Sequence, residues 1–327
     1  MHEKQFHYDS MFLTLTFDDD HIFQRDNPRS LDHTEFQKFM KRLRKHIWEN
    51  NIPDKVKQKL KFYNELYKQN GVTEEDKKRY SKRKKELMEP YQVSYFMCGE
   101  YGKLNGRPHY HAIIYGYEPK DMELWTVRNG ERYYISEEIR KLWSVGYHVI
   151  GTVTFQSAAY VARYLMKKQY GDSALHYYAA IDYDTGEIMA TRVPEYAKMS
   201  LNPALGKKWI HKYYKEAYNN DFVTLDGNKF TLPRYYDKFM KEFDEEKYNE
   251  IKEKRTETIV NNQEDQTYER LVVREKVQQL KLERLVRELD QHEDKHLHSF
   301  RQQSPSIPNT ISSTKRPVSD QSNERVY

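Results

Sequence analysis

The stretch 107-RPHYHAIIY-115 decides the fold, because its side chains alternate as they do in a half-polar β-strand. Successive side chains of a strand point to opposite faces of a sheet. His109 and His111 are therefore expected on one face, and Tyr110, Ala112 and Ile114 on the other. One face of this strand carries chemistry, and the other belongs to a core.

The residues before this stretch predict its partner strand. Val93 to Glu100 is rich in β-forming residues, and a Gly-Lys-Leu-Asn-Gly turn follows at 102–106. Cross-strand neighbours lie close together, so Glu100 is expected opposite His109 or nearby. Two imidazoles and a carboxylate can hold Mg²⁺ or Mn²⁺ and leave positions for water or a phosphate oxygen. Taken alone, the His-x-His pair is weak evidence, and Glu100 is equally consistent with a solvated charge.

The elements around this hairpin indicate an α+β protein. We expect an antiparallel sheet of about five strands flanked by helices. Asp32 is the expected N-cap of an early helix, with Glu35 at the capping-box position. The expected strands are Phe12–Phe17, Val93–Glu100, Arg107–Tyr115 and Tyr147–Phe155, with a further hairpin at 180–193; the expected helices lie at 32–47, 135–144, 157–170 and 202–216.

A helix rich in tyrosine is expected from Ser157 to about Tyr170. Its apolar face would hold Ala158, Val161, Ala162, Leu165 and Met166, and the opposite face Tyr160, Tyr164 and Lys167. A tyrosine hydroxyl is a nucleophile once activated, and Lys167 and Arg163 lie near enough to stabilise a phenolate or a phosphate. The alternative is that these tyrosines stack on bases or pack beneath a loop.

Composition limits the class of protein. The 327 residues carry a net charge of +5, and residues 1–240 alone carry +7, a modest excess that favours nucleic acid as a partner. No apolar run approaches the length of a membrane span, and residues 1–10 are unlike a signal peptide. With Cys98 as the single cysteine, we expect a reduced, cytoplasmic protein without a disulfide framework.

Charge and hydropathy suggest three regions. Residues 1–240 are expected to form the main domain, with a charged helical insertion at about 53–90 that is either a solvated segment or a DNA contact. Residues 241–300 are expected to be a charged helical extension. Its apolar stripe favours either self-association as a coiled coil through 268–290 or a helix folded back on the domain. Residues 301–327 are expected to be disordered.

Three motifs in order make the chain resemble HUH endonucleases of the Rep superfamily, most closely the replication initiators of gokushovirus-type Microviridae phages. Phe12 to Asp19 resembles the first motif, Gly106 to Ala112 the His-hydrophobe-His motif, and Tyr160 to Lys167 the tyrosine motif. The sequence departs from the pattern twice: the hydrophobe is the bulky Tyr110, and Arg163 stands where a lysine is usual.

The resemblance implies an enzyme of rolling-circle replication that nicks single-stranded origin DNA, forms a 5′-phosphotyrosine with a free 3′-hydroxyl, and later rejoins the circle. It implies a host helicase and polymerase as partners, and no G-x-x-x-x-G-K-[ST] motif for a helicase of its own is present. By this resemblance the catalytic residues are Tyr160, Tyr164 and Lys167, the metal ligands are His109, His111 and Glu100, and the DNA-binding residues are Arg107, Arg163 and Lys168.

Three alternatives remain open from the sequence. The chain is alternatively an HUH relaxase or transposase, a non-catalytic origin-binding protein with the same fold, or an RNA-binding or interaction protein with a coiled-coil tail. Only the first of these also predicts a tyrosine–DNA bond.

Overall fold

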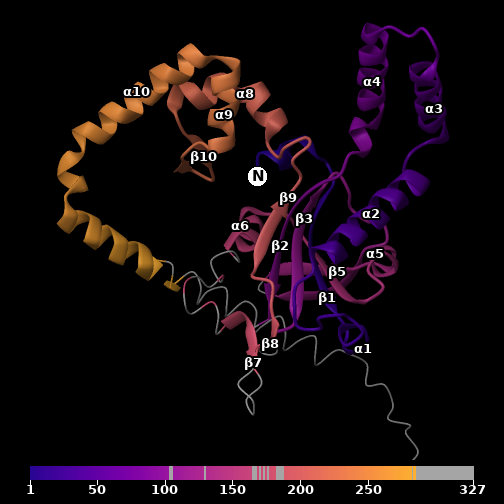
Figure 1. Ribbon diagram of the computed structural model, residues 1–327, viewed down its shortest axis with the longest axis horizontal. Helices are drawn as coiled ribbons and strands as arrows, with labels where there is room; N and C mark the ends of the chain where they lie inside the picture. The colour runs from indigo at the N-terminus through magenta and orange to yellow at the C-terminus, as the bar shows by residue number, and fades with distance from the viewer. Residues whose placement is uncertain are drawn as a thin grey trace, which may run out of the picture.

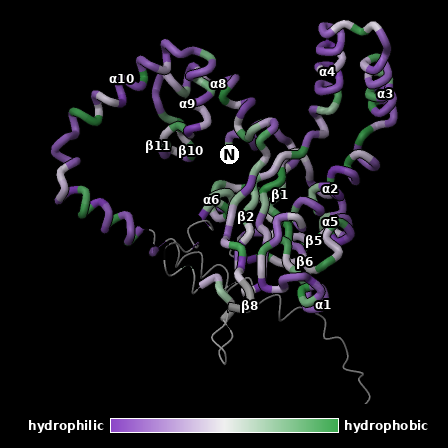
Figure 2. Tube along the Cα trace, in the orientation of Figure 1, coloured by the Kyte–Doolittle hydropathy of each residue, from purple (hydrophilic) through white to green (hydrophobic). Residues whose placement is uncertain are grey.

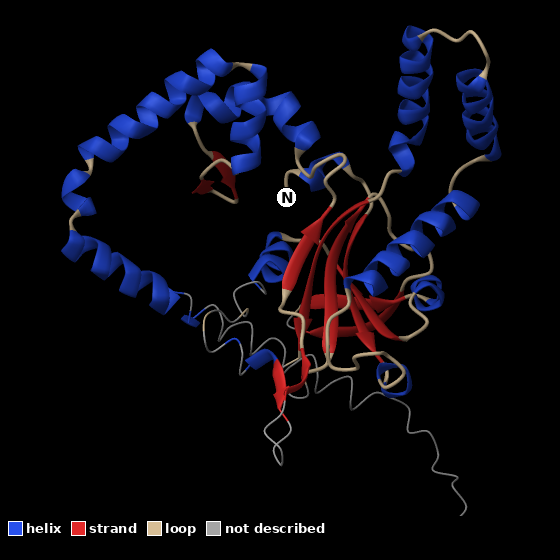
Figure 3. Cartoon of the chain, viewed as in Figure 1, coloured by secondary structure: helices blue, strands red, loops and turns tan. Residues whose placement is uncertain are grey.

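A seven-stranded antiparallel sheet forms the centre of the molecule (Figures 1 and 3). The computed structural model describes residues 1–102, 106–128, 130–163, 168, 171, 174, 177–181, 188–281 and 283–284. Across the sheet the strands run β4 (Glu123–Arg128), β5 (Glu131–Ile135), β6 (Gly146–Gly151), β1 (Ser10–Phe17), β3 (Pro108–Tyr115), β2 (Ser94–Tyr101) and β9 (Tyr196–Met199). The expected α+β class is confirmed.

The sheet is wider than the sequence suggested, with seven strands in place of about five. The additional strands are the β4–β5 hairpin and the four-residue β9, which pairs with β2. The hairpin expected at 180–193 forms a separate two-stranded sheet of β7 (Ala179–Ile181) and β8 (Ile188–Thr191). Tyr147–Phe155 is also shorter as a strand than expected, because Phe155 already begins the next helix.

One face of the sheet packs on α2 (His33–Asn50) and α5 (Glu137–Leu142). As expected, Asp32 caps α2 by accepting a hydrogen bond from the backbone N–H of Thr34 at 2.8 Å. Glu35 is used differently: its carboxylate accepts from the hydroxyl of Tyr110 at 2.6 Å. This contact gives the bulky hydrophobe its room, since Tyr110 is fully buried with its hydroxyl at the start of α2. The core on this face also contains Met11, Leu13, Leu15, Phe17, Phe36, Phe39, Met40, Leu43, Met97, Ala112, Ile114 and Trp143.

The opposite face carries a smaller core beneath α6 (Phe155–Arg163). Phe12, Cys98, Ile113, Tyr115, Val153 and Val161 form it. The alternation predicted for 107–115 is therefore confirmed, because Ile113 and Tyr115 lie on this side of β3 and Ala112 and Ile114 on the other.

The insertion expected at 53–90 forms two helices, α3 (Asp54–Lys68) and α4 (Glu74–Met88), followed by η2 (Glu89–Tyr91). They pack together as a hairpin that projects from the end of α2 (Figure 1). A short helix, α1 (Asp19–Ile22), follows β1 near the opposite end of the sheet (Figure 1).

The helices after the sheet have a core of their own. The elements are α8 (Lys207–Asn220), β10 (Val223–Leu225), β11 (Asn228–Phe230), α9 (Arg234–Phe243), α10 (Glu245–Asn261) and η4 (Gln263–Gln266). Ile210, Tyr236, Met240 and Ile251 lie in this second core. The expected domain boundary at residue 240 thus falls inside a hydrophobic cluster. Arg255 of α10 closes the cluster by donating to the carboxylates of Asp221 and Asp237.

The N-terminal segment joins the two cores. In η1 (Glu3–Phe6), the carboxylate of Glu3 accepts a hydrogen bond from the backbone N–H of Gly206 at 2.7 Å. The ring of His2 stacks on Trp209 with centroids 3.7 Å apart. These contacts fix the beginning of α8 against the sheet.

A further helix covers 268–281, and its apolar residues Val273, Val277 and Leu280 are 44–53% exposed. Self-association through 268–290 stays a prediction, and the tail at 301–327 lies outside the described residues. No helix in the described part of the chain is both long and apolar enough to cross a membrane.

Candidate active site

The predicted histidines lie together on the α6 face of the sheet, where β1, β3 and β2 are neighbours. Their register brings Thr14 opposite His111 and Glu100 opposite His109, as expected for Glu100. His109, His111 and Glu100 are 8%, 5% and 1% exposed. Glu100 is therefore a buried carboxylate, which excludes its interpretation as a solvated strand-end charge. A buried charge of this kind requires partners.

Hydrogen bonds orient both imidazoles. His111 Nε2 lies 2.7 Å from Glu100 Oε1, and His111 Nδ1 lies 2.9 Å from the hydroxyl of Thr14. The carboxylate can only accept, so Nε2 donates to it and Nδ1 of a neutral ring accepts from Thr14. His109 Nδ1 donates to the carbonyl oxygen of Arg107 at 2.6 Å, which leaves the ring lone pair on Nε2. Such a bond to a backbone carbonyl is typical of histidines that bind metals through the other nitrogen.

The donor types suit Mg²⁺ or Mn²⁺, with two imidazoles and a carboxylate on adjacent strands. Within the described residues, however, no three His, Cys, Asp or Glu side chains are arranged to hold a metal ion as they stand. The direct contact between Glu100 and His111 accounts for part of this, since a cation shared by them would replace their hydrogen bond. The metal site therefore stays a prediction, supported by the chemistry of its donors.

The tyrosine helix packs directly over these histidines. Thr154 and Ser157 exchange hydrogen bonds between their backbone N–H groups and side-chain oxygens at 2.9 and 3.1 Å, which is the arrangement of a capping box. This starts α6 at Phe155, two residues before the expected start. Val161 is fully buried beneath it, and α6 contacts β2 and β3.

Tyr160 lies on the sheet side of α6, which corrects the expected division of its faces. Its ring is 5.4 Å from that of His111 and 5.9 Å from that of Phe12, both in edge-on contact. Ala162, expected on the buried face, is exposed instead. The helix is rotated so that Val161 and Tyr160 together meet the sheet, and this brings the tyrosine to the histidines.

The remaining site predictions have mixed outcomes. Tyr164 and Lys167 lie outside the described residues. Arg163 ends α6, and Arg163 and Lys168 are both half-buried. Arg107 donates to the carbonyl oxygen of Phe17 at 2.7 Å and pairs with the carboxylate of Asp19. The acidic end of the first motif therefore holds this arginine at the edge of the site.

Sequence reasoning missed two residues of the site. Thr14 alternates with Phe12 along β1, but its contact with His111 depends on a strand pairing that joins residues 97 positions apart. Gly102 ends the strand carrying Glu100, and a Cβ there would come within 3.0 Å of His109 Cε1. The glycine signal was present in the turn motif, but its target was not.

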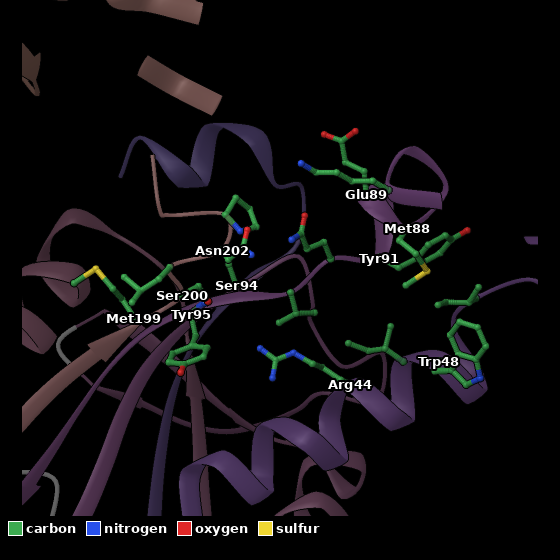
Figure 4. A pocket seen from close by; sticks show the side chains of 17 residues that line it. Arg44, Trp48, Met88, Glu89, Tyr91, Ser94, Tyr95, Met199, Ser200 and Asn202 are labelled. Carbon is green, nitrogen blue, oxygen red and sulfur yellow. The ribbon is translucent and has the colours of Figure 1, made fainter. Parts of the chain in front are cut away.

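Two cavities lie near the sheet. One, of about 800 Å³, borders Gly102 and is lined by Arg29, Arg107, Arg192 and several aromatic side chains, so it offers cations beside the histidines. The other, of about 630 Å³, lies between α2 and the root of α4, with Arg44, Trp48 and Tyr95 on its walls (Figure 4). Its lining includes none of the three predicted metal ligands.

Comparison with known proteins agrees with this geometry. Residues 63–169 match the family model of the replication-associated protein ORF2, a range that includes both histidines, Glu100 and Tyr160. This segment of the chain belongs to the replication-associated protein ORF2 family. No solved structure matches the chain.

Phage proteins are similar over a longer range. The chain is 32% identical to replication-associated protein VP4 of Bdellovibrio phage phiMH2K over 252 residues, which cover 76% of this chain and 63% of that protein. Replication-associated protein ORF4 of Chlamydia phage 1 is 26% identical over 77% of this chain and 53% of its own length. For replication-associated protein ORF2 of Spiroplasma virus 4 the values are 32%, 50% and 48%. The chain thus spans between about half and 63% of the relatives it matches.

Proposed function

We propose that this chain is a replication initiator that nicks single-stranded origin DNA through a tyrosine. The single observation that carries the proposal is the contact of Tyr160 with His111, which brings a nucleophile from a helix to a buried His–His–Glu group on the sheet. The names of the similar phage proteins support a role in replication. The chemistry of the site supports phosphodiester cleavage.

In the proposed reaction, the hydroxyl oxygen of Tyr160 or Tyr164 forms a bond to phosphorus, and the bond from phosphorus to the 3′ oxygen breaks. The tyrosine gives up its proton, with Lys167 as the proposed acceptor, and the leaving 3′ oxygen gains one. The products are a 5′-phosphotyrosine and a free 3′-hydroxyl, which a host polymerase can extend. Attack of a 3′-hydroxyl on the phosphotyrosine reverses the step and closes the circle.

His109, His111 and Glu100 would hold Mg²⁺ or Mn²⁺. Bound there, the cation would draw negative charge from a phosphate oxygen. The chain's own contribution is orientation: Thr14 and the Arg107 carbonyl fix the two rings, and burial of Glu100 keeps water from this group. Arg107, Arg163 and Lys168 are proposed to bind the DNA backbone, as cations at the edge of the site.

The test is a denaturing gel of the protein mixed with circular single-stranded DNA, in Mn²⁺ and in EDTA. We expect a slow band that resists boiling, forms only with metal, and is abolished by Tyr160→Phe combined with Tyr164→Phe. Tyr8→Phe is the matched control, since Tyr8 is fully exposed and far from α6 in the chain. An adduct in the double variant would overturn the tyrosine assignment. If wild type gives no adduct on any origin DNA, the protein is a non-catalytic origin binder.

A further inference from the structure

The α3–α4 hairpin is a projection with little core of its own. Leu60 is the one buried residue that the two helices contain, and α4 has none. Tyr63 and Tyr80 pack against each other between the helices, with ring centroids 6.1 Å apart. Segments that extend over the surface of a rigid scaffold often carry function.

This projection carries the positive charge of the protein. Residues 54–88 contain 12 Lys and Arg and 6 Asp and Glu, a net charge of +6, so the other 292 residues together carry −1. Seven of the nine residues from Lys77 to Lys85 are basic and none is acidic. Figure 2 shows α4 as mainly hydrophilic. The net positive charge of the chain therefore comes from one helical hairpin.

The acidic residues of α4 do not neutralise this run. Glu74, Glu75 and Asp76 all lie in the first turn, where the helix dipole favours negative charge. Two of them pair locally, Glu74 with Lys77 and Asp76 with Arg79. Beyond that turn, the charged side chains of the helix are all cations as far as Glu86.

The inner and outer faces of α4 differ in chemistry. The inner face meets α3 through Tyr80 and Lys84, and Lys84 donates to Asn64 at 2.9 Å while it covers the ring of Tyr67. Lys78, Lys82 and Lys85 follow one another at i, i+4 and i+7, on the opposite side of the helix. All three are exposed, and no carboxylate of the described residues lies within 4 Å of them. Glu89, one turn from Lys85, is held by Lys208 at 2.6 Å.

A row of lysines without aromatic neighbours suits the phosphate backbone of duplex DNA. Binding of single strands relies on rings on which bases stack, and the tyrosines of this hairpin are turned inward against each other. Lysines bind phosphates as point charges without reading sequence. The 15 residues of α4 span about 22 Å, the length of about six base pairs.

The hairpin lies at the end of the sheet opposite the candidate active site. α4 leads through η2 into the start of β2 at Ser94, whereas Glu100 stands near the other end of that strand. Six residues of strand separate them by about 20 Å. One DNA molecule can therefore contact both places.

We propose that the outer face of α4, formed by Lys78, Lys82 and Lys85, is a second DNA-binding surface that holds duplex DNA by its phosphates. It rests on the proposed function in one respect: the DNA held here is the duplex that flanks the nicked strand. Nothing in the proposed reaction requires this surface, so the two proposals can fail separately.

The test compares Lys78→Gln/Lys82→Gln/Lys85→Gln with a control that loses the same charge elsewhere, Lys241→Gln/Lys252→Gln/Lys254→Gln. These control lysines are exposed on α9 and α10. Affinity for a 30-base-pair duplex is measured by fluorescence anisotropy from 50 to 300 mM NaCl. We expect the hairpin variant to reduce the slope of log K against log salt by about 2.7, or 0.9 for each lysine, and affinity near 0.15 M salt by tenfold or more. The control is expected to keep both.

Three results would overturn the surface: an unchanged slope, an equal loss in the control, or an equal loss of affinity for a single-stranded 30-mer. Adduct formation on a short single-stranded oligonucleotide distinguishes the two proposals, since the hairpin variant keeps it and Tyr160→Phe/Tyr164→Phe keeps duplex binding. A wild type that forms no adduct, yet loses its salt slope with the three lysines, would refute the nicking proposal and leave this surface standing.

Discussion

The ring of Tyr160 stands almost perpendicular to the imidazole of His111, at an angle of 86° and with centroids 5.4 Å apart. His111 is in turn bonded to Glu100 and Thr14, so one contact links helix α6 to three strands of the sheet. A change in the orientation of either ring must be accommodated by the other. The candidate nucleophile and the candidate metal ligands therefore form one packed unit.

Gly102 is expected to control the position of His109. In Gly102→Ala the new methyl group would approach His109 Cε1 at 3.0 Å, so the ring must shift and adduct formation should fall at least tenfold. Gly99→Ala is the matched control on the same strand, because its methyl meets Leu31 at 3.0 Å on the other face. Measured adduct rates that fall equally in both variants would show a general effect on the strand.

Glu100→Gln is expected to weaken divalent cation binding while the fold survives, because glutamine keeps the shape and loses the charge. Wild type should be stabilised by about 2.7 kcal/mol when Mn²⁺ is present at 100 times its Kd, and EDTA should remove this gain. The readout is the melting temperature across a Mn²⁺ titration. The control is Glu195→Gln, another buried glutamate, whose carboxylate accepts from Tyr178. A Mn²⁺ response that is unchanged in Glu100→Gln would remove this residue from the metal site.

Acid is expected to destabilise the protein through His148. Burial lowers the pKa of His148 to about 4, from 6.5 in an unfolded chain, and its Nε2 accepts from the backbone N–H of Ser136. The unfolded state thus takes up a proton first, so stability is complete above pH 6.5 and is lost as the pH falls toward 4, by roughly 3 kcal/mol. His148→Gln should flatten urea-unfolding free energies over this range. A pH profile parallel to wild type would contradict the assignment.

The C-terminal core is expected to need α10. A chain ending at residue 240 loses Ile251 and the Arg255 bridges to Asp221 and Asp237, which exposes apolar surface and leaves two carboxylates unpaired. It should melt several degrees below a chain ending at residue 262 and bind more of a hydrophobic dye. Equal melting temperatures would favour a boundary at 240.

Local sequence patterns were enough to predict the strands, the capped helix α2 and the shared face of His109 and His111. Each follows from a period of two or 3.6 residues, which neighbours in the chain decide. The register of Glu100 also followed, because a five-residue turn limits how the hairpin pairs. The confirmed fold class is the sum of these local rules.

Other features depended on contacts between distant segments. The rotation of α6 that turns Tyr160 toward the sheet is set by packing on β2 and β3, which the helical period alone does not specify. The contacts of Thr14 with His111 and of Arg107 with Asp19 join residues 97 and 88 positions apart. The width of the sheet was missed because β9 has only four residues and the sequence around β4 gave no distinct alternation.

Glu3 bears on the order in which the chain is made and folded. It is 8% exposed, and one of its partners, Gly206, is 203 residues later in the sequence. At the usual rate of translation, roughly 10 to 40 s pass between the two. The central strands can pair in that interval while this carboxylate waits in water, so its capture by Gly206 is a late event that seals the sheet to the helices after it.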